Sequence, residues 1–396
     1  MELEQELQQE VLSCLDLSEE LSDRELLERI DTILVREGKR RGISLRERTG
    51  YRKKLFDSFR RLDVLQELVE DDSITEIMVN GMEAVFLERD GMVHQWNRHF
   101  SSREKLEDVI QQMVARVNRI VNTSSPIVDA RLEDGSRVNV VLPPVAPDGP
   151  ILTIRKFSRE AITMEMLIEW GSITDEAAGF LEALVKAGYN LFISGGTGSG
   201  KTTFLNALSR AIPSQERVIT IEDSLELQLA IPNLVRLEAR NANIEGEREV
   251  TIRDLIRTAL RMRPDRILIG EVRGREALDL LQAMNTGHDG SLSTGHGNSP
   301  ADMLSRLETM VLMGGELPLA AVRSQIASAL DILVHLGRMR DGRRRVLSIV
   351  EVLGYEEEQI RCQPLYESNP AEERGLEAVG ILRNRQKWEI AGLPPL

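Results

Sequence analysis

Apolar residues recur at helical spacing near the start of the chain. They are Leu12, Leu15, Leu17, Leu21, Leu26, Leu27, Ile30, Ile33 and Leu34. Spacings of three and four residues predict amphipathic helices. Ser22 followed by Glu25 indicates a capping box that opens one of them. We therefore expect a helical extension over residues 1–48, in which the basic stretch 36–48 is either a solvated helix end or an adaptor surface toward a membrane-bound partner.

A second pattern runs over residues 49–157, where short apolar runs surround one longer amphipathic segment. Strand-like runs at 77–80 and 84–87 flank Gly81, and an amphipathic helix is expected over 105–121. Two further strands are expected at 138–142 and 151–154, separated by a loop rich in Pro and Gly that could act as a hinge. The pattern predicts a small α/β domain.

From residue 158 to 396 apolar runs alternate with helical patterns. The expected strands are 191–194, 218–221, 234–237, 267–269 and 292–294. Alternation of this kind predicts a mainly parallel sheet covered by helices. Further on, the runs 332–336 and 346–352 flank Asp341-Gly342, which is a hairpin signal.

Directly after the first of these strands comes a complete phosphate-binding loop, G-x-x-x-x-G-K-[ST]. Its residues, with the threonine that follows, are Gly195, Gly196, Thr197, Gly198, Ser199, Gly200, Lys201, Thr202 and Thr203. The order of strand, loop and helix is the context that this motif requires. Backbone N–H groups and the helix N-terminus would hold phosphates. Lys201 would reach the β and γ phosphates of ATP, and the Thr202 hydroxyl would hold Mg²⁺.

Composition narrows the class of protein. The net charge is −14, which disfavours nucleic acid as the main partner. The chain shows no run of 18 apolar residues and an acidic start without a signal-peptide core, so we expect a cytoplasmic protein that does not span a membrane. Cys14 and Cys362 are its two cysteines, too few for a disulfide framework or a four-cysteine zinc site.

Carboxylates end two of the expected strands. Glu271 follows the run 266–270, in which Gly270 stands where many P-loop enzymes have aspartate. Glu271 is the expected Mg²⁺ residue, so a second acid must activate water. Because parallel strands end on one edge, Glu222 is the candidate, with Asp223 and Glu226 as alternates.

Two histidines, His288 and His296, lie in a segment rich in Gly, Ser and Thr between residues 286 and 299. Either could sense the γ-phosphate or relay a conformational change. The alternative is that both are structural side chains with satisfied hydrogen bonds.

Four segments in order resemble the Walker A, Asp box, Walker B and His box of the secretion-superfamily ATPases, which serve type II and type IV secretion and type IV pili. They are residues 195–202, 220–226, 266–274 and 286–299. Segments 74–81, 129–139, 272–278 and 285–291 are similar to the CpaF branch, which powers Flp (tight-adherence) pilus assembly. The resemblance covers about residues 50–355.

The resemblance implies an N-terminal domain hinged to a RecA-like ATPase domain, assembled as a hexameric ring that uses ATP and Mg²⁺. It implies that Arg131, Arg137 and Arg155 of the N-terminal domain reach the phosphates. It also implies a peripheral place at the cytoplasmic face of the inner membrane, through a platform protein and other assembly proteins.

Three hypotheses of function follow. The first is an ATPase motor for Flp or type IV-like pilus assembly or type II-like secretion. The second is a type IV secretion or conjugation ATPase. The third is a nucleotide-gated scaffold with little turnover.

Overall fold

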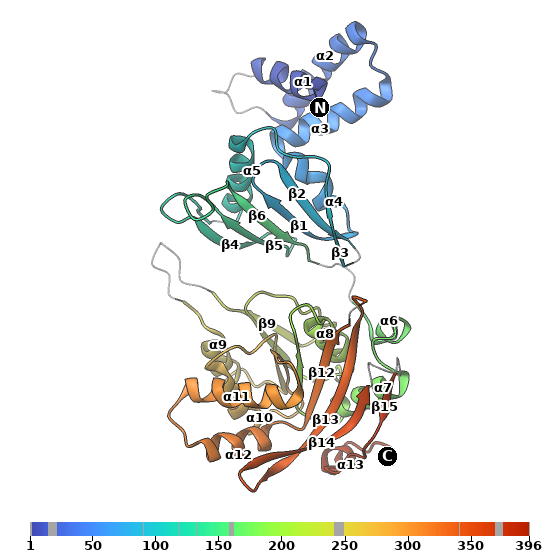
Figure 1. The fold of residues 1–396 in the computed structure, drawn as a ribbon, viewed down its shortest axis with the longest axis vertical. Helices are drawn as coiled ribbons and strands as arrows, with labels where there is room; N and C mark the ends of the chain where they lie inside the picture. Colours follow the sequence, from blue (N-terminus) through green and yellow to red (C-terminus); the bar gives the residue numbers. More distant parts are fainter. Residues whose placement is uncertain are drawn as a thin grey trace. The chain divides into compact units, whose positions relative to one another are not determined.

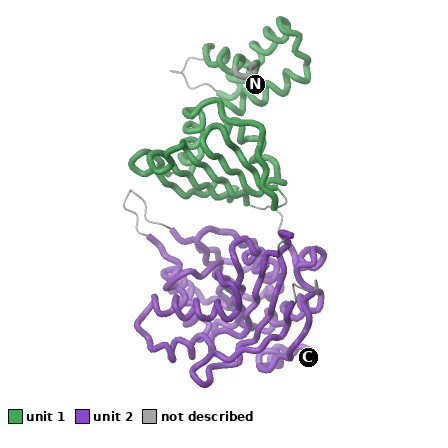
Figure 2. Tube along the Cα trace, viewed as in Figure 1, with its two compact units in different colours: residues 1–159 green, residues 160–396 purple. Residues whose placement is uncertain are grey.

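The computed structural model describes residues 2–14, 22–89, 91–117, 119–132, 134–157, 162–240, 249–339, 341–368 and 375–395. Two compact units divide the chain, residues 1–159 and 160–396 (Figure 2). Within the described residues, no helix combines the length and the apolar character needed to cross a membrane.

Three helices open the first unit and share a small apolar core (Figure 1). They are α1 (Glu2–Ser13), α2 (Asp23–Arg41) and α3 (Leu45–Arg60). The capping box of Ser22 and Glu25 begins α2 as expected. The helical part extends past residue 48, because α3 continues to Arg60 and buries Leu55 with the other two helices. Leu15, Leu17 and Leu21 of the apolar pattern lie outside the described residues.

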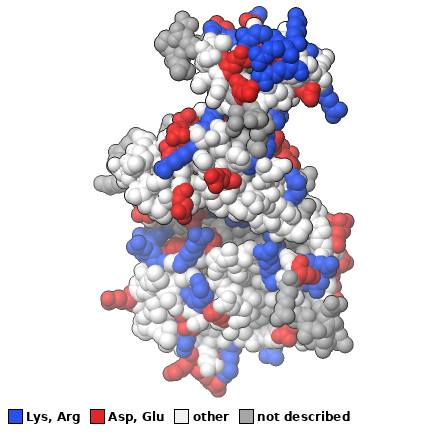
Figure 3. Space-filling view, turned by 45° about the horizontal axis from the view of Figure 1, so that its top comes forward, with Lys and Arg blue, Asp and Glu red and all other residues white. Residues whose placement is uncertain are grey.

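Acidic side chains form ion pairs with arginines of the basic stretch in the helical part (Figure 3). Glu37 is buried, and its carboxylate lies within ion-pair distance of Arg36, Arg40 and Arg41. Arg41 also pairs with Glu6 at 2.6 Å. Much of this positive charge is therefore compensated within the helices.

A six-stranded antiparallel sheet forms the rest of the first unit, in the order β3-β2-β1-β6-β5-β4. Its strands are β1 (Ile74–Asn80), β2 (Ala84–Arg89), β3 (Met92–Gln95), β4 (Ile127–Arg131), β5 (Arg137–Val141) and β6 (Ile151–Arg155). The short elements η1 (Asp63–Leu65) and α4 (Gln66–Glu70) precede it, and α5 (Arg103–Ala115) packs its apolar side chains on the sheet. The helix expected over 105–121 ends earlier, at Ala115.

A nine-stranded mixed sheet forms the second unit, in the order β15-β14-β13-β12-β7-β11-β10-β8-β9. Its strands are β7 (Leu191–Gly195), β8 (Val218–Glu222), β9 (Leu234–Glu238), β10 (Arg266–Ile269), β11 (Leu292–His296), β12 (Ile332–Arg338), β13 (Arg344–Glu356), β14 (Gln359–Ser368) and β15 (Leu376–Ala378). Strands β12 through β9 pair in parallel, whereas β13, β14 and β15 add an antiparallel extension. The five expected parallel strands and the hairpin are present, but β14 and β15 make the sheet less parallel than the pattern predicted.

Helices cover both faces of this sheet (Figure 1). They are α6 (Met164–Glu169), α7 (Asp175–Lys186), α8 (Lys201–Ser209), α9 (Ile252–Ala259), α10 (Glu276–Met284), α11 (Pro300–Gly314), α12 (Leu319–Ala329) and α13 (Gln386–Ile390). Helices α6, α7 and α8 belong to one core, and α9 to α12 belong to the other. Strand residues alternate between the two, since Ile193 packs in the first core and Phe192 in the second.

Candidate nucleotide-binding site

The phosphate-binding loop is held by a strand with a neighbour on each side. Every residue of β7 is buried. In register, Gly195 at its end lies opposite His296 of β11 and Leu336 of β12. The loop therefore starts from a fixed point at the carboxyl edge of the parallel sheet, where ligands of such sheets bind.

The glycines of the loop are needed for its shape. Gly198 and Gly200 have φ angles of 70° and 90°, which other residues rarely adopt. A Cβ on Gly195 would lie 2.5 Å from the Leu336 carbonyl oxygen and from Ser199 Oγ. Gly200 caps α8, whose first turn holds Lys201, Thr202 and Thr203. The N-terminus of α8 thus offers backbone N–H groups and the positive end of its dipole to an anion.

Lys201 lies inside the loop that precedes it. Its Nζ donates to the carbonyl oxygens of Gly195 at 3.2 Å and Gly196 at 3.0 Å, and lies 3.3 Å from Nδ1 of His296. Burial lowers the pKa of Lys201, and the nearby Glu271 carboxylate acts in the opposite direction. The lysine is therefore a partly desolvated cation aimed at the centre of the site.

Glu271 follows β10 and meets His296 from the neighbouring strand. Oε1 of Glu271 lies 2.8 Å from Nε2 of His296, and Oε2 accepts a hydrogen bond from Arg273 at 2.6 Å. The contact with His296 is close but not aligned as a hydrogen bond, so Oε1 is a buried acceptor without a hydrogen-bond partner in the described chain. Lys201, His296 and Glu271 thus form one connected row.

Glu222 ends β8 and is almost fully buried. Its Oε2 accepts the backbone N–H groups of Glu226 at 2.7 Å and Leu227 at 2.9 Å, while Oε1 has no hydrogen-bond partner among the described residues. Burial raises the pKa of Glu222 against the effect of those two hydrogen bonds. A carboxylate with one oxygen fixed and the other open has the form expected of a general base.

Gly270 explains the departure from the usual Walker B pattern. A Cβ at this position would lie 3.1 Å from Cγ of Glu222. In the paired strands, Gly270 is the residue just after β10, and its N–H donates to the Ile221 carbonyl oxygen. The missing side chain at Gly270 therefore makes room for the side chain of Glu222.

His288 is not part of this cluster. It precedes β11, and its Nδ1 lies 3.1 Å from the carbonyl oxygen of Ala283 near the end of α10. Three residues later, the backbone N–H of Ser291 donates a hydrogen bond to Oδ1 of Asn190, the residue just before β7. His288 therefore lies at the opposite edge of the sheet from His296, with the length of β11, about 15 Å, between them.

The three candidate arginines of the first unit form a row across its sheet. In register, Arg131 lies opposite Arg137, Arg137 opposite Arg155, and Arg155 opposite Glu76. Opposed residues of antiparallel strands point to the same face, so three guanidinium groups share one face. Like charges placed directly opposite one another repel, and the Glu76 carboxylate offsets this repulsion where it faces Arg155.

His335 is a site residue that the sequence pattern did not single out. It lies on β12 opposite Ser194, and its Nδ1 is 2.9 Å from Ser194 Oγ, directly before the phosphate loop. Burial lowers the pKa of His335, and a hydrogen bond with the Asn298 backbone opposes that effect. A histidine inside the apolar run 332–336 was the available signal, since a buried imidazole requires polar partners.

A magnesium ion fits the donor set of this edge. Mg²⁺ prefers carboxylate, hydroxyl and water oxygens. Oε1 of Glu271 is a buried oxygen without a hydrogen-bond partner in the described chain. With the hydroxyl of Thr202 on the first turn of α8, it could hold a hydrated ion, which would neutralise phosphate charge there.

Comparison with known proteins identifies the family of the chain. The sequence profile of the type II/IV secretion system protein family matches residues 60–372. A candidate conjugal transfer protein of Mycobacterium tuberculosis is 38% identical over 292 residues, 72% of this chain and 83% of the relative. The type IV secretion system protein PtlH of Bordetella pertussis is 35% identical over 323 residues, 73% of this chain and 93% of the relative.

Solved structures share the fold. The Legionella pneumophila ATPase DotB aligns with a TM-score of 0.51 and 22% identity, covering 74% of this chain and 80% of that one. This likeness confirms the α/β fold expected from the sequence. The chain therefore belongs to the type II/IV secretion system protein family, with the fold and the phosphate-binding loop of that family's ATPases.

Proposed function

We propose that this chain is an Mg-dependent ATPase that drives a type IV secretion or conjugation machine. The observation that carries the proposal is the row of Lys201, His296 and Glu271 at the carboxyl edge of the sheet. Lys201 would bind the β and γ phosphates, and Glu271 would hold Mg²⁺ through water. The names of the conjugal transfer and PtlH relatives favour this kind of machine.

Glu222 would activate the attacking water. Its fixed Oε2 keeps the carboxyl in place, and its open Oε1 can accept a proton. A raised pKa brings this carboxylate nearer to neutral pH, which favours a general base. His296 would position Glu271 and report the state of the γ-phosphate to β11.

The motor would work as a hexameric ring at the cytoplasmic face of the inner membrane, bound to a platform protein. Arg131, Arg137 and Arg155 would add positive charge to the phosphates. Their common face supports this role, because bidentate guanidinium groups suit phosphate oxygens.

A second candidate is the motor of Flp or type IV-like pilus assembly, or of type II-like secretion. Segments 74–81 and 129–139, which include β1 and parts of β4 and β5, favour the Flp branch. Affinity purification of the full chain from its own cells separates the two candidates. Co-purified pilus platform and prepilin proteins would favour assembly of pili, and mating-channel proteins would favour conjugation.

Steady-state ATPase activity against protein concentration tests the proposed chemistry. We expect turnover per chain to rise as rings form, and Lys201→Ala to lose ATP binding. Tight binding of ATP without turnover, even with membranes and partner proteins present, would contradict the motor and favour a nucleotide-gated scaffold.

A further inference from the structure

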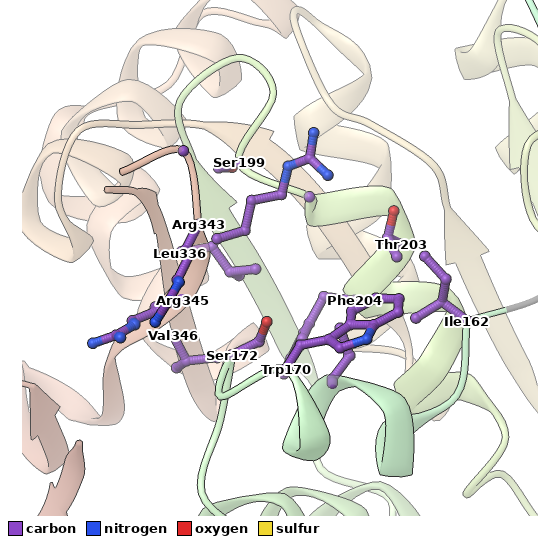
Figure 4. Close-up of a pocket in the computed structure, with 14 residues that line it drawn as sticks. Ile162, Trp170, Ser172, Ser199, Thr203, Phe204, Leu336, Arg343, Arg345 and Val346 are labelled. Carbon is purple, nitrogen blue, oxygen red and sulfur yellow. The ribbon is translucent and has the colours of Figure 1, made fainter. Parts of the chain in front are cut away.

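His335 is a buried polar side chain on the strand next to the one that leads into the phosphate-binding loop. Only 7% of its surface is exposed. Successive residues of β12 point to opposite faces of the sheet. Leu336 packs in the first core and lines a pocket beside the loop (Figure 4). His335 points to the opposite face, which it shares with Leu333 of the second core.

The imidazole of His335 joins two segments of chain that border the phosphate-binding loop. Its Nδ1 lies 2.9 Å from Oγ of Ser194, the residue directly before Gly195. The ring also makes a hydrogen bond with the backbone of Asn298, two residues after His296. Burial lowers the pKa of His335, and this bond opposes that effect, as donation from a ring N–H to a carbonyl oxygen does. A neutral imidazole has one N–H, so Nδ1 is left to accept from the Ser194 hydroxyl.

The turn that follows His296 is held against the phosphate-binding loop at two points. The N–H of Gly297 donates to the Gly195 carbonyl oxygen at 3.4 Å, which is a long hydrogen bond. His335 supplies the second point, because it holds the Asn298 backbone. Without the imidazole, the place of the turn beside Gly195 would depend on the long bond.

Asn298 is also fixed to the start of α11. Its N–H donates to Oδ2 of Asp302 at 2.8 Å. The N–H of Asp302 in turn donates to Oγ of Ser299, the N-cap of α11, at 3.1 Å. Through Asn298, His335 therefore connects β12 and β7 with the first turn of α11.

We propose that His335 is a positioning residue for ATP hydrolysis, which keeps His296 in place beside Lys201 and Glu271 and does not itself contact the nucleotide. The inference rests on the proposed function, because the place of His296 affects hydrolysis only if this edge binds ATP. Loss of the imidazole should therefore lower kcat more than it weakens ATP binding.

Kinetics of the full chain with three substitutions of one residue test the proposal. His335→Leu removes both hydrogen bonds and should lower kcat by about tenfold or more, because small displacements of catalytic groups are costly, while the Kd of ATP changes little. The amide of His335→Gln reaches the place of Nε2 and should restore part of kcat through Asn298. The amide of His335→Asn reaches only the place of Nδ1, near Ser194, and should restore less.

His288→Leu is the matched control. The ring of His288 also lies against a backbone carbonyl oxygen, that of Ala283, but at the other edge of the sheet. Its kcat should stay close to that of the wild type. If His335→Leu does not fold, the order of His335→Gln above His335→Asn decides, and equal kcat values of these two would overturn the role of the Asn298 bond.

A double variant separates positioning from a structural role. In a His296→Ala background, His335→Leu should lower kcat no further, because residues that act as a unit give effects that do not add. Additive losses would contradict the proposal, and so would a His335→Leu chain with normal kcat. Either result in a chain whose wild type hydrolyses ATP rejects the positioning role alone. A wild-type chain that did not hydrolyse ATP would overturn the proposed function, and this inference with it.

Discussion

Nε2 of His296 lies 2.8 Å from Oε1 of Glu271, where the neighbouring strands β11 and β10 end. Nδ1 of the same ring lies 3.3 Å from Nζ of Lys201. Burial lowers the pKa of His296, so the ring is neutral at pH 7 and can accept from the lysine on one side. One imidazole thus connects the phosphate loop with the strand that carries the expected metal residue.

Replacing His296 with alanine should lower kcat by about 10- to 100-fold, because Glu271 would lose its neighbour while the loop stayed intact. ATP affinity should change little. His288→Ala is the control, since that histidine lies at the other edge of the sheet. Steady-state kinetics of both variants test the assignment, and equal losses would contradict it.

The pH dependence of kcat should have an acidic limb with its midpoint below 6.5, the ordinary pKa of histidine, because burial lowers the pKa of His296. As pH falls through that lowered pKa, the ring gains a charge beside the Lys201 cation, and the row is disrupted. A rate profile from about pH 5 to 8 measures the limb. Protonation of Glu222, whose pKa is raised by burial, also contributes to this limb, so His296→Gln should shift its midpoint and not remove it. A limb that was identical in His296→Gln would belong to Glu222 alone.

Glu222→Gln should lower kcat by about 100-fold or more, while ATP still binds. Its thermal midpoint should stay equal or rise. The pKa of Glu222 is raised in the fold, so the stability that its protonated form provides is lost as pH rises through that pKa, and a neutral amide avoids the loss.

Asp223→Asn and Glu226→Gln serve as comparisons for Glu222→Gln, because these acids follow the same strand. We expect smaller effects from both. If Asp223→Asn lost turnover and Glu222→Gln stayed active, Asp223 would be the general base instead of Glu222.

Gly270→Ala should reduce kcat, because the new Cβ would stand 3.1 Å from Cγ of Glu222 and force that side chain to shift. Gly179→Ala on α7 is the matched control, since nothing lies within 4 Å of a Cβ there. Activity and melting temperature of the two variants should differ clearly. Full activity in Gly270→Ala would show that Glu222 tolerates displacement.

Arg155→Gln should lower turnover and change thermal stability little, because the exposed guanidinium lies between the like charge of Arg137 and the opposite charge of Glu76. Arg103→Gln, an exposed arginine on α5 of the same unit, is the control. ATPase assays with thermal melts of both variants separate a role at the phosphates from a structural one. An Arg155→Gln chain with unchanged kcat would contradict the former.

The central parallel strands were predictable from sequence because they are buried on both faces, whereas the edge strand β9 is only partly buried. The runs 267–269 and 191–193 are apolar without interruption, as central strands of a covered sheet require. The phosphate-binding loop could also be predicted from sequence, because its glycines and lysine have fixed spacing. Strand β14 was not visible, because Gln359, Arg361 and Gln363 make it look like a polar loop, although its hydrogen bonds to β13 hold it in the sheet.

The remainder of the site depends on distances that no pattern contains. From the sequence, Gly270 is only a position that lacks the usual acid. The structure adds the reason, since a Cβ built there would lie against Glu222. His288 and His296 have similar flanking residues, and only the direction of β11 separates them. His335 looked like part of an apolar strand, and its contact with Ser194 arises from the pairing of β12 with β7.

The central position of β7 gives the two sides of the site separate consequences for evolution and engineering. Glu222, Glu271 and His296 lie on or just after β8, β10 and β11, to one side of β7, whereas β12 and the β12–β13 hairpin lie on the other side. A substitution on the hairpin that leaves the phosphate-binding loop in place should therefore change kcat little. Apart from those at His335, whose ring reaches Asn298, substitutions on the two sides of β7 can accumulate independently of one another.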